Sequence, residues 1–539
     1  MRFGKTSIIY LFPVIILSII SCNAPTPLDP AQKNLIPKPV SVSSTGKSFT
    51  LKADTKIYIN GSTMLKSVGD YLSEKFSTAT GFDLLVESGD QAPASGIYLI
   101  VDSTSNNHNP EGYELSVSED LIKISSPTEA GIFYGIQTLR QLLPPEIEMP
   151  GLQNTEWKIP TGTIVDYPAY AWRGTMLDVA RHFFSVEDVK RYIDLASYYK
   201  INIMHLHLSD DQGWRIEIKS WPNLTTHGGS TAVGGGKGGF FTQEQYINII
   251  EYAKTRFITI IPEIDLPGHI NAALASYGEL NGGTIVPEEG KVTPVVAPDL
   301  GSKSRPTKLY TGIAVGWSTL RVEKEVSFRF TEDVIREISA ITPGPYFHIG
   351  GDEAAATKKE DYITFINRFK GIVKNNNKIM IGWDEIAQAA IDSSIITQHW
   401  SSAKHAEMAV EKGSKLIMSP AKKAYLDMSY DSTSKLGLHW AAYIEVDSAY
   451  KWNLSTHIKS IDRFSILGIE APLWSETISN MDELEYLAFP RLPGYAEIGW
   501  SPETGRGWDE YKVRLGNHGQ YMRAMGIDFY RSKLVPWRD

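Results

Sequence analysis

The chain has 539 residues, of which 42% are hydrophobic and 21% are charged, and its formal net charge is -9. This length exceeds the roughly 100–200 residues of a typical single domain, so we expect more than one folding unit. The acidic balance, without a long run of one sign, argues against nucleic acid as a partner, because nucleic-acid-binding proteins usually present a basic face.

The N-terminal segment has the pattern of an export signal. Arg2 and Lys5 precede an apolar run over residues 8–20, which suits the core of a signal peptide and is too short for a spanning helix. No later apolar run reaches the roughly 18 residues that a transmembrane helix needs. Residues 1–22 are therefore predicted to be a signal peptide.

Cys22, which closes this segment, is the only cysteine of the chain. It follows Ile-Ile-Ser, a context that resembles a bacterial lipobox, in which the cysteine becomes the lipid-modified first residue of the mature protein. The alternative is a plain signal peptide with an incidental cysteine. We expect lipidation at Cys22, a flexible Pro-rich tether over residues 23–34, and an exported protein anchored to a bacterial membrane on its periplasmic or cell-surface side.

Residues 35–165 combine short alternating runs, typical of strands, with two helical stretches. Acidic side chains are scattered here without clustering, so we expect no chemistry in this part. The pattern predicts a small α+β domain with an antiparallel sheet. The expected strands cover residues 55–60, 96–101, 113–117 and 121–124, and the expected helices cover residues 64–78 and 128–142.

From residue 166 to residue 539 the pattern changes to apolar strand, loop and amphipathic helix in repetition. Strands that are buried on both faces and alternate with helices indicate a parallel sheet. Eight of them suit an α/β fold, the (β/α)8 TIM barrel. The strands are expected at residues 174–179, 201–208, 258–264, 346–350, 378–382, 395–399, 415–418 and 466–470, with helices such as 186–200, 243–256 and 330–341 between them.

Polar and aromatic side chains follow nearly every predicted strand. In a barrel, catalytic groups come from the C-terminal ends of the strands, so we expect a polar pocket there. Four tryptophans among them favour a carbohydrate ligand, because sugar rings offer apolar C–H faces and hydroxyl edges, although core packing explains any single tryptophan equally well. These residues include Asp178, Arg181, His205, His207, Asp210, Asp211, Glu263, Asp265, His269, His348, Asp352, Glu353, Trp383, Trp400, Tyr425, Asp427, Trp440, Trp474 and Glu476.

Asp352 and Glu353 form an acidic pair directly after Gly350 and Gly351, which let the backbone approach a ligand closely. Glycosidases usually hold two carboxyls about 5–5.5 Å apart when retaining and about 6.5–9.5 Å apart when inverting. Neighbours on a strand point to opposite faces, so this pair is expected to be poorly placed for that scheme. We interpret Glu353 as the acid for the leaving oxygen and Asp352 as a holder of the substrate; the alternative is a solvated loop pair.

Four longer motifs lie at these strand ends. They are Leu208-Ser-Asp-Asp-Gln-Gly-Trp-Arg-Ile-Glu217, Pro262-Glu-Ile-Asp-Leu-Pro-Gly-His269, His348-Ile-Gly-Gly-Asp-Glu353 and Gly468-Ile-Glu-Ala-Pro-Leu-Trp-Ser-Glu476. In this order they resemble glycoside hydrolase family 20, the β-N-acetylhexosaminidases. The resemblance implies an exo-acting, retaining hydrolase of terminal N-acetylglucosamine or N-acetylgalactosamine in oligosaccharides or glycoconjugates, without a cofactor or metal.

The resemblance also implies substrate-assisted catalysis, in which the 2-acetamido oxygen of the substrate attacks the anomeric carbon and forms an oxazolinium ion. Asp352 would orient the acetamido N–H and stabilise the developing charge, and Tyr425 would hydrogen-bond the acetamido oxygen. Glu353 would act first as acid and then as base. The pocket wall and the contacts to the sugar hydroxyls are implied for Arg181, Trp383, Trp400, Trp440, Trp474 and Glu476, with Asp427 at the rim.

The resemblance further implies that Asp210 and His269 support the acid, with Asp211 as the alternative to Asp210. The chain departs from the family at Leu206, where the family often has a tryptophan between two histidines. Because neighbours on a strand alternate, Leu206 should point into the barrel wall or helix layer, which would alter packing and leave the chemistry intact.

Two other functions remain as alternatives. His205 and His207 share one strand face, as do zinc ligands of metal-dependent amidohydrolase barrels, and His269, His348 and His399 could complete such a site. Those barrels usually carry the pair on the first strand, whereas here it lies on the second. A non-catalytic glycan-binding lipoprotein would fit the tryptophans and the anchor, but such a protein needs no proton donor.

Overall fold

The computed structural model describes residues 1, 4, 29–89, 91–102, 109–288 and 304–538. The predicted signal peptide, the lipidation residue Cys22 and most of the tether therefore lie outside the described residues. Within the described ranges, no helix combines the length and the apolar character that crossing a bilayer requires.

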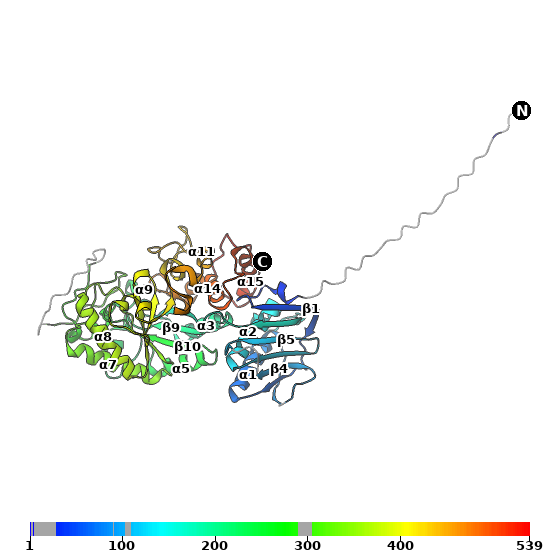
Figure 1. Cartoon of the computed structure of the whole chain (residues 1–539), viewed down its shortest axis with the longest axis horizontal. Coiled ribbons are helices and arrows are strands. Elements are labelled where there is room, and N and C mark those ends of the chain that lie inside the picture. Colours follow the sequence, from blue (N-terminus) through cyan, green and yellow to red (C-terminus); the bar gives the residue numbers. More distant parts are fainter. Residues whose placement is uncertain (2–3, 5–28, 90, 103–108, 289–303, 539) are drawn as a thin grey trace.

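A seven-stranded sheet with two helices forms the N-terminal part of the structure (Figure 1). Strands β1, β7, β5 and β6 pair antiparallel, whereas β6, β4, β2 and β3 run parallel. The prediction of an antiparallel sheet was wrong for this second half, because a helix links β2 to β3 and returns the chain in the same direction. In sheet order the strands are β1 (Ser41–Thr50), β7 (Lys158–Asp166), β5 (Tyr113–Val117), β6 (Leu121–Ser126), β4 (Gly96–Val101), β2 (Ile57–Asn60) and β3 (Val86–Ser88).

Helices α1 (Thr63–Thr80) and α2 (Glu129–Leu142) pack on one face of this sheet and share its hydrophobic core. They lie between the sheet and the rest of the molecule in Figure 1. Ser62 caps the start of α1 by accepting the Leu65 N–H, and Gly81 ends it in the left-handed conformation.

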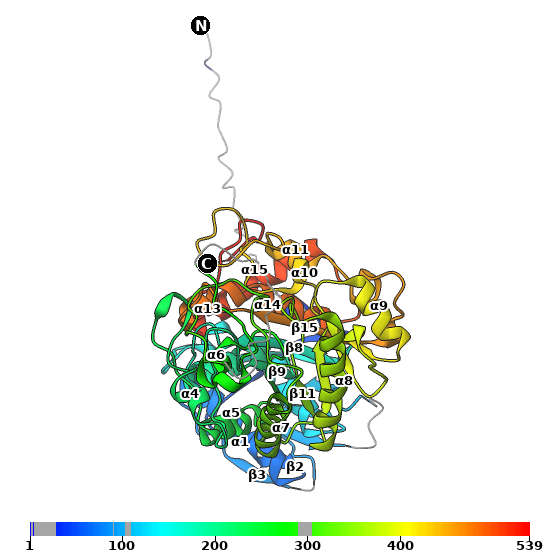
Figure 2. The ribbon, with the colours of Figure 1, turned by 90° about the vertical axis from the view of Figure 1, so that its left-hand side faces the viewer.

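Eight parallel strands close into a barrel, which confirms the predicted (β/α)8 architecture. All eight predicted strands are present, with ends shifted by up to three residues. Figure 2 looks onto this barrel, with β8, β9, β11 and β15 near the centre and helices around them. The strands are β8 (Trp172–Asp178), β9 (Ile203–His207), β10 (Thr259–Glu263), β11 (Tyr346–His348), β12 (Ile379–Trp383), β13 (Ile396–His399), β14 (Lys415–Met418) and β15 (Ile466–Leu473).

Two helices of the barrel begin with a capping box. A capping box formed by Ser185 and Asp188 starts α3, and one formed by Thr242 and Gln245 starts α5. The longer helices are α3 (Val186–Tyr198), α5 (Gln243–Lys254), α7 (Glu325–Ile341), α8 (Lys359–Asn375), α9 (Ala403–Glu411), α13 (Met481–Ala488), α14 (Arg491–Trp500) and α15 (Trp508–Ala524). The shorter ones are α4 (Asn223–Thr226), α6 (Asn271–Ser276), α10 (Ala421–Ala424), α11 (Val446–Tyr450) and α12 (Leu454–His457).

Side chains inside the barrel change from apolar to polar along the strands. One apolar cluster takes a residue from each of six strands: Trp172, Ile203, Ile261, Ile381, Ile396 and Ile417. Residues two positions further along a strand point the same way, and three of these are His205, Glu263 and Gln398, all buried. The polar residues thus lie nearer to the C-terminal ends of the strands, where barrel enzymes place their sites.

Buried polar contacts join the two parts of the molecule. The Arg173 guanidinium at the start of β8 pairs with Glu111 at 2.8 Å, and Lys200 after α3 pairs with Asp166 at 2.9 Å. Trp500, at the end of α14, belongs to the hydrophobic core of the N-terminal part. The N-terminal domain is therefore packed against the end of the barrel opposite to the polar strand ends.

Candidate active site

A hollow of about 150 Å³ lies at the C-terminal ends of the barrel strands. Apart from Asp210 and Trp383, every predicted catalytic or sugar-binding residue lines it. The lining consists of Arg181, His269, Ile313, Val315, Asp352, Glu353, Trp400, Tyr425, Asp427, Leu438, Trp440, Trp474 and Glu476. Drug-sized ligands usually occupy roughly 300–1,000 Å³, so this hollow suits one sugar ring better than a chain.

The acidic pair lies in a loop and not on a strand, because β11 ends at His348. Gly350 and Gly351 have φ angles of 65° and 95°, and Glu353 has a φ of 44°, so the backbone turns sharply here. The expectation that the two carboxylates point to opposite faces was therefore wrong. An oxygen of Asp352 lies 3.6 Å and an oxygen of Glu353 lies 3.5 Å from the same His269 Nε2.

The two acids differ instead in their surroundings. Asp352 is buried, whereas the side chain of Glu353 keeps 35% of its surface exposed. Burial, helped by the nearby Asp265 carboxyl, raises the pKa of Asp352 well above its usual value. Unequal surroundings of two carboxyls are a common basis for unequal roles.

His269 connects the acidic pair to a third carboxylate. Its Nδ1 lies 3.2 Å from Asp210 Oδ1, while Asp211 accepts instead from the Asn271 N–H and the Ser318 hydroxyl. Asp210 is thus the acid that contacts His269. Although burial alone lowers the pKa of His269, the charges of Asp210 and Asp352 raise it well above its usual value, which favours the protonated ring.

Arg181 lies in the wall of the hollow, and its charge is held by two buried carboxylates. It pairs with Asp178 at 3.2 Å and with Asp210 at 2.8 Å. Its Nε has no hydrogen-bond partner among the described residues, and the same holds for Glu476 Oε2 and for both Asp427 oxygens. Buried polar atoms normally find partners, so one donor and several acceptors here suit the hydroxyl groups of a sugar.

Aromatic rings form much of the remaining wall. The Trp400 and Tyr425 rings are stacked with centroids 6.5 Å apart, and the Trp440 ring meets each of them edge-on at 6.1 Å. Trp474 lies 6.2 Å from Tyr425. Trp440 is 57% exposed and therefore lies at the mouth, whereas the other three are more deeply set.

Two predicted positions differ in detail from expectation. Trp383 is buried and does not line the hollow; its Nε1 donates to Glu263 Oε1 at 2.9 Å, and its ring lies 6.0 Å from the Trp474 ring. Trp383 therefore packs behind Trp474 and supports the wall through this contact. Asp427 is 1% exposed and belongs to the wall itself, not to the rim.

The sequence-based interpretation missed three residues of this region and gave a fourth, Asp265, no role. Ile313, Val315 and Leu438 line the hollow from long loops, where apolar residues give no periodic signal. Asp265 is buried beside Asp352, and it accepts the Gly351 N–H at 2.9 Å. Its place four positions before His269 in a strand-end motif was the one available signal for this residue.

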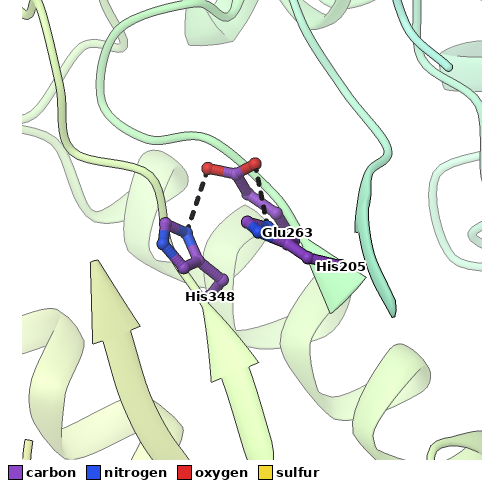
Figure 3. A group of neighbouring side chains, drawn as sticks. All are labelled: His205, Glu263 and His348. Atoms are coloured by element: carbon purple, nitrogen blue, oxygen red, sulfur yellow. Dashed lines mark ion pairs between the residues drawn. The ribbon is translucent and has the colours of Figure 1, made fainter. Parts of the chain in front are cut away.

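A cluster beneath the hollow contains the histidines of the proposed metal alternative. Figure 3 shows Glu263 between His205 and His348, with separations of 3.1 Å and 3.0 Å. Glu263 also accepts from Trp383 and His207, and His348 Nδ1 accepts the Gly350 N–H. Hydrogen bonds thus occupy both oxygens of Glu263, while Nε2 of His205 and Nε2 of His348 have no hydrogen-bond partner among the described residues.

Leu206 agrees with its predicted orientation. It is fully buried and belongs to the large core cluster of the barrel and its helices, while His205 contacts Glu470 at 2.8 Å and His207 contacts Asp210 at 2.9 Å. The substitution therefore changes the packing side of β9 and leaves the polar side unaltered.

The chain is similar in sequence and in structure to known glycoside hydrolases. The profile described as "Glycosyl hydrolase family 20, catalytic domain" matches residues 170–363 and 356–503, and "Glycosyl hydrolase family 20, domain 2" matches residues 32–167. A Beta-N-acetylhexosaminidase from Cellulomonas fimi is 36% identical over 507 residues, covering 93% of this chain and 97% of that protein.

Two similar solved structures have a TM-score of 0.88 and 44% sequence identity. One is the GH20 beta-N-acetylhexosaminidase from Streptomyces coelicolor A3(2), matched over 95% of this chain and 100% of that chain. The other is a mutant Streptomyces plicatus beta-hexosaminidase in complex with its product GlcNAc, matched over 96% of this chain and 99% of that chain.

Proposed function

The chain belongs to glycoside hydrolase family 20, and from this premise we propose that it is an exo-acting, retaining β-N-acetylhexosaminidase. The two matching family profiles confirm the family that the sequence motifs indicated. The observation that carries the proposal is the unequal pair Asp352 and Glu353, one buried and one at the mouth, which both approach His269. A binding module needs neither an acid at the mouth nor a charged support for it.

In the proposed first step the substrate supplies its own nucleophile. The carbonyl oxygen of the 2-acetamido group forms a bond to the anomeric carbon, while the bond to the leaving oxygen breaks and that oxygen takes the proton of Glu353. Asp352 accepts the acetamido N–H and stabilises the positive charge of the oxazolinium ion. Tyr425 donates its hydroxyl to the acetamido oxygen and positions it for attack.

In the second step Glu353 removes a proton from water, and that water attacks the anomeric carbon and opens the oxazolinium ring. Two displacements at one carbon give retention of configuration. The protonated His269 lies 3.5 Å from Glu353, where its charge favours the carboxylate that remains after the first proton transfer. Asp210 holds this ring in place from its other side.

The small hollow supports exo action on terminal residues. Arg181, Asp427 and Glu476 offer a donor and acceptors for the outer hydroxyls of one ring, and Trp400 and Trp474 present apolar faces to it. Oligosaccharides and glycoconjugates with a terminal non-reducing N-acetylglucosamine or N-acetylgalactosamine are the proposed substrates.

The acid–base role of Glu353 is tested with Glu353→Gln and a nitrophenyl N-acetylglucosaminide. The amide keeps the shape and cannot give up a proton, so kcat should fall by about 10²–10⁴-fold. Binding of the product N-acetylglucosamine, measured by calorimetry, should survive. Glu360→Gln, in the first turn of α8, is the matched control and should behave as wild type. Full turnover by the Glu353 variant would overturn the mechanism.

We also propose that the protein is exported and anchored to a membrane by a lipid on Cys22. The apolar run before this single cysteine supports the proposal. In a bacterial host, wild type should incorporate labelled palmitate and enter the detergent phase on phase separation, and Cys22→Ser should do neither. Labelling of the variant at wild-type level would contradict the anchor.

A further inference from the structure

Asp265 is a buried acid for which the mechanism above has no use. It follows β10, and its Oδ1 accepts the N–H of Gly351 at 2.9 Å. The loop that carries Asp352 is built closely around this carboxyl, since a Cβ at Gly350 would lie 2.0 Å from Asp265 Oδ1. The position of Asp352 is therefore coupled to that of Asp265.

Asp265 and Asp352 each have one oxygen that lacks a hydrogen-bond partner among the described residues. If both are ionised, Asp265 Oδ2 and Asp352 Oδ1 are buried acceptors without a hydrogen-bond partner among the described residues. An oxygen of Asp265 and an oxygen of Asp352 nevertheless lie within 4.8 Å of each other and of a His269 nitrogen, and a hydrogen bond between the two side chains contributes to the pKa of each. One proton between the two oxygens would satisfy both at once.

The electrostatics favour such a shared proton over a cation. Two carboxylates at this separation in a buried site do not both ionise readily. A metal ion in the same place would face His269, which carries positive charge because Asp210 and Asp352 raise its pKa. The groups that face Asp265 are Glu263 from β10, His269 and Asp352 from loops, and Tyr362 from α8.

We propose that Asp265 is a positioning residue of the reaction, which shares a proton with Asp352 and thereby holds the Asp352 carboxylate toward the acetamido group of the substrate. The inference rests on the proposed function, because it assigns Asp352 to the acetamido N–H. When Asp265 keeps the proton, Asp352 carries the negative charge that the oxazolinium ion requires. The shared proton holds one oxygen of Asp352, so its other oxygen stays directed toward the acetamido group.

The arrangement predicts a loss of activity at alkaline pH. Burial raises the pKa of Asp265 to about 8 and also raises that of Asp352, so the pair holds a proton at neutral pH and loses it as the pH rises. After that loss, two adjacent carboxylates repel each other and Asp352 loses its hydrogen-bond donor. The kcat/KM of the wild type should accordingly fall on the alkaline side.

The test compares Asp265→Asn with Asp265→Ala. Asparagine resembles a protonated aspartic acid, since its NH2 can donate to Asp352 while its oxygen accepts from Gly351. We expect Asp265→Asn to retain kcat within about tenfold of wild type, and Asp265→Ala to lose about 100-fold or more because Asp352 is misplaced. The alkaline limb of the Asn variant should move to higher pH by about one unit or more.

Equal losses in the two variants, or an unchanged alkaline limb in Asp265→Asn, would overturn the inference. If the Ala variant does not fold, the pH profile of the Asn variant decides alone. Asp70→Asn, on the exposed side of α1, is the control and should leave the profile unchanged.

A measurement without turnover separates this inference from the proposed function. The infrared difference spectrum between wild type and Asp265→Asn at neutral pH should contain the C=O band of a protonated carboxylic acid. A spectrum with carboxylate bands alone would contradict the shared proton, even in an active enzyme. Absence of wild-type activity on N-acetylated substrates, with the acid band present, would instead contradict the function alone.

Discussion

At the scale of single residues, the two adjacent acids of this pocket differ in how far their side chains are buried. Asp352 is buried against Asp265, and Glu353 is partly open to solvent beside the same histidine. A carboxyl at the mouth can exchange its proton with water between two catalytic steps, whereas the buried Asp352 is held in place by its neighbours and shielded from water. The division of roles thus follows from burial, not from opposite faces of a strand.

The hydroxyl of Tyr425 should contribute to kcat without stabilising the fold. Its ring packs between Trp400 and Trp474, and these contacts survive in Tyr425→Phe. Loss of one positioned donor should lower kcat by about 10²-fold, with little change in thermal unfolding. Tyr346→Phe, at the opposite end of the barrel against Trp172, is the control and should keep full activity. Equal kcat values for wild type and the Tyr425 variant would remove this residue from the mechanism.

At the scale of elements, the loop after β11 determines where the acids lie. Gly350 and Gly351 adopt φ values that favour glycine, and Asp265 occupies the space beside them. Strand positions were predictable from sequence because each barrel strand is a buried apolar run with a clear rhythm. The conformation of the loop was not predictable, because residues with positive φ angles follow no periodic pattern in the sequence. The orientation of Glu353 depends on these residues.

Site residues that directly follow a strand could be predicted from sequence, whereas those in long loops could not. Arg181, Trp474 and Glu476 follow strands directly, so the barrel topology brings them together. Ile313 and Val315 come from the long connection between β10 and α7, where nothing in the pattern indicates contact with the pocket. The parallel half of the N-terminal sheet was missed, although the helix at residues 64–78 was expected, because strand patterns alone do not show which strands pair or in which direction.

Gly350→Ala tests the role of the loop. The new Cβ would lie 2.0 Å from Asp265 Oδ1 at a backbone φ of 65°, so the loop must shift and Asp352 with it. We expect kcat to fall by about 10²-fold, the effect of a displacement of about 1 Å at a reacting group. Gly371→Ala, in α8 with open space around its Cβ, should keep full activity and gain about 0.5–1 kcal/mol of stability. Similar activities of the two variants would contradict the role of the loop.

At the scale of the whole molecule, the N-terminal domain supports the barrel from the end opposite to the pocket. Trp500 of α14 completes the core of the N-terminal domain, and the Tyr521 hydroxyl of α15 donates to the carbonyls of Gln141 and Leu143 at the end of α2. Figure 1 shows α15 beside this junction. We therefore expect the two parts to unfold together.

Lys200→Met tests this junction. The variant removes the cation that lies 2.9 Å from the fully buried Asp166, and loss of one partner of a buried pair costs about 3 kcal/mol. The urea midpoint should fall, in a single transition. Lys66→Met breaks an exposed pair with Asp70 on α1 and should cost less than about 0.5 kcal/mol. An unchanged midpoint for Lys200→Met, or a separate early transition, would show that the junction is not part of one cooperative unit.

The central claim is that the nucleophile belongs to the substrate. It is tested most directly by comparing kcat/KM for nitrophenyl N-acetylglucosaminide with the value for the corresponding glucoside, which carries a hydroxyl in place of the acetamido group. Because an intramolecular nucleophile gives a very large advantage, we predict a ratio of about 10³ or more. Rates within about tenfold of each other would contradict the account, since the enzyme would then supply the nucleophile itself.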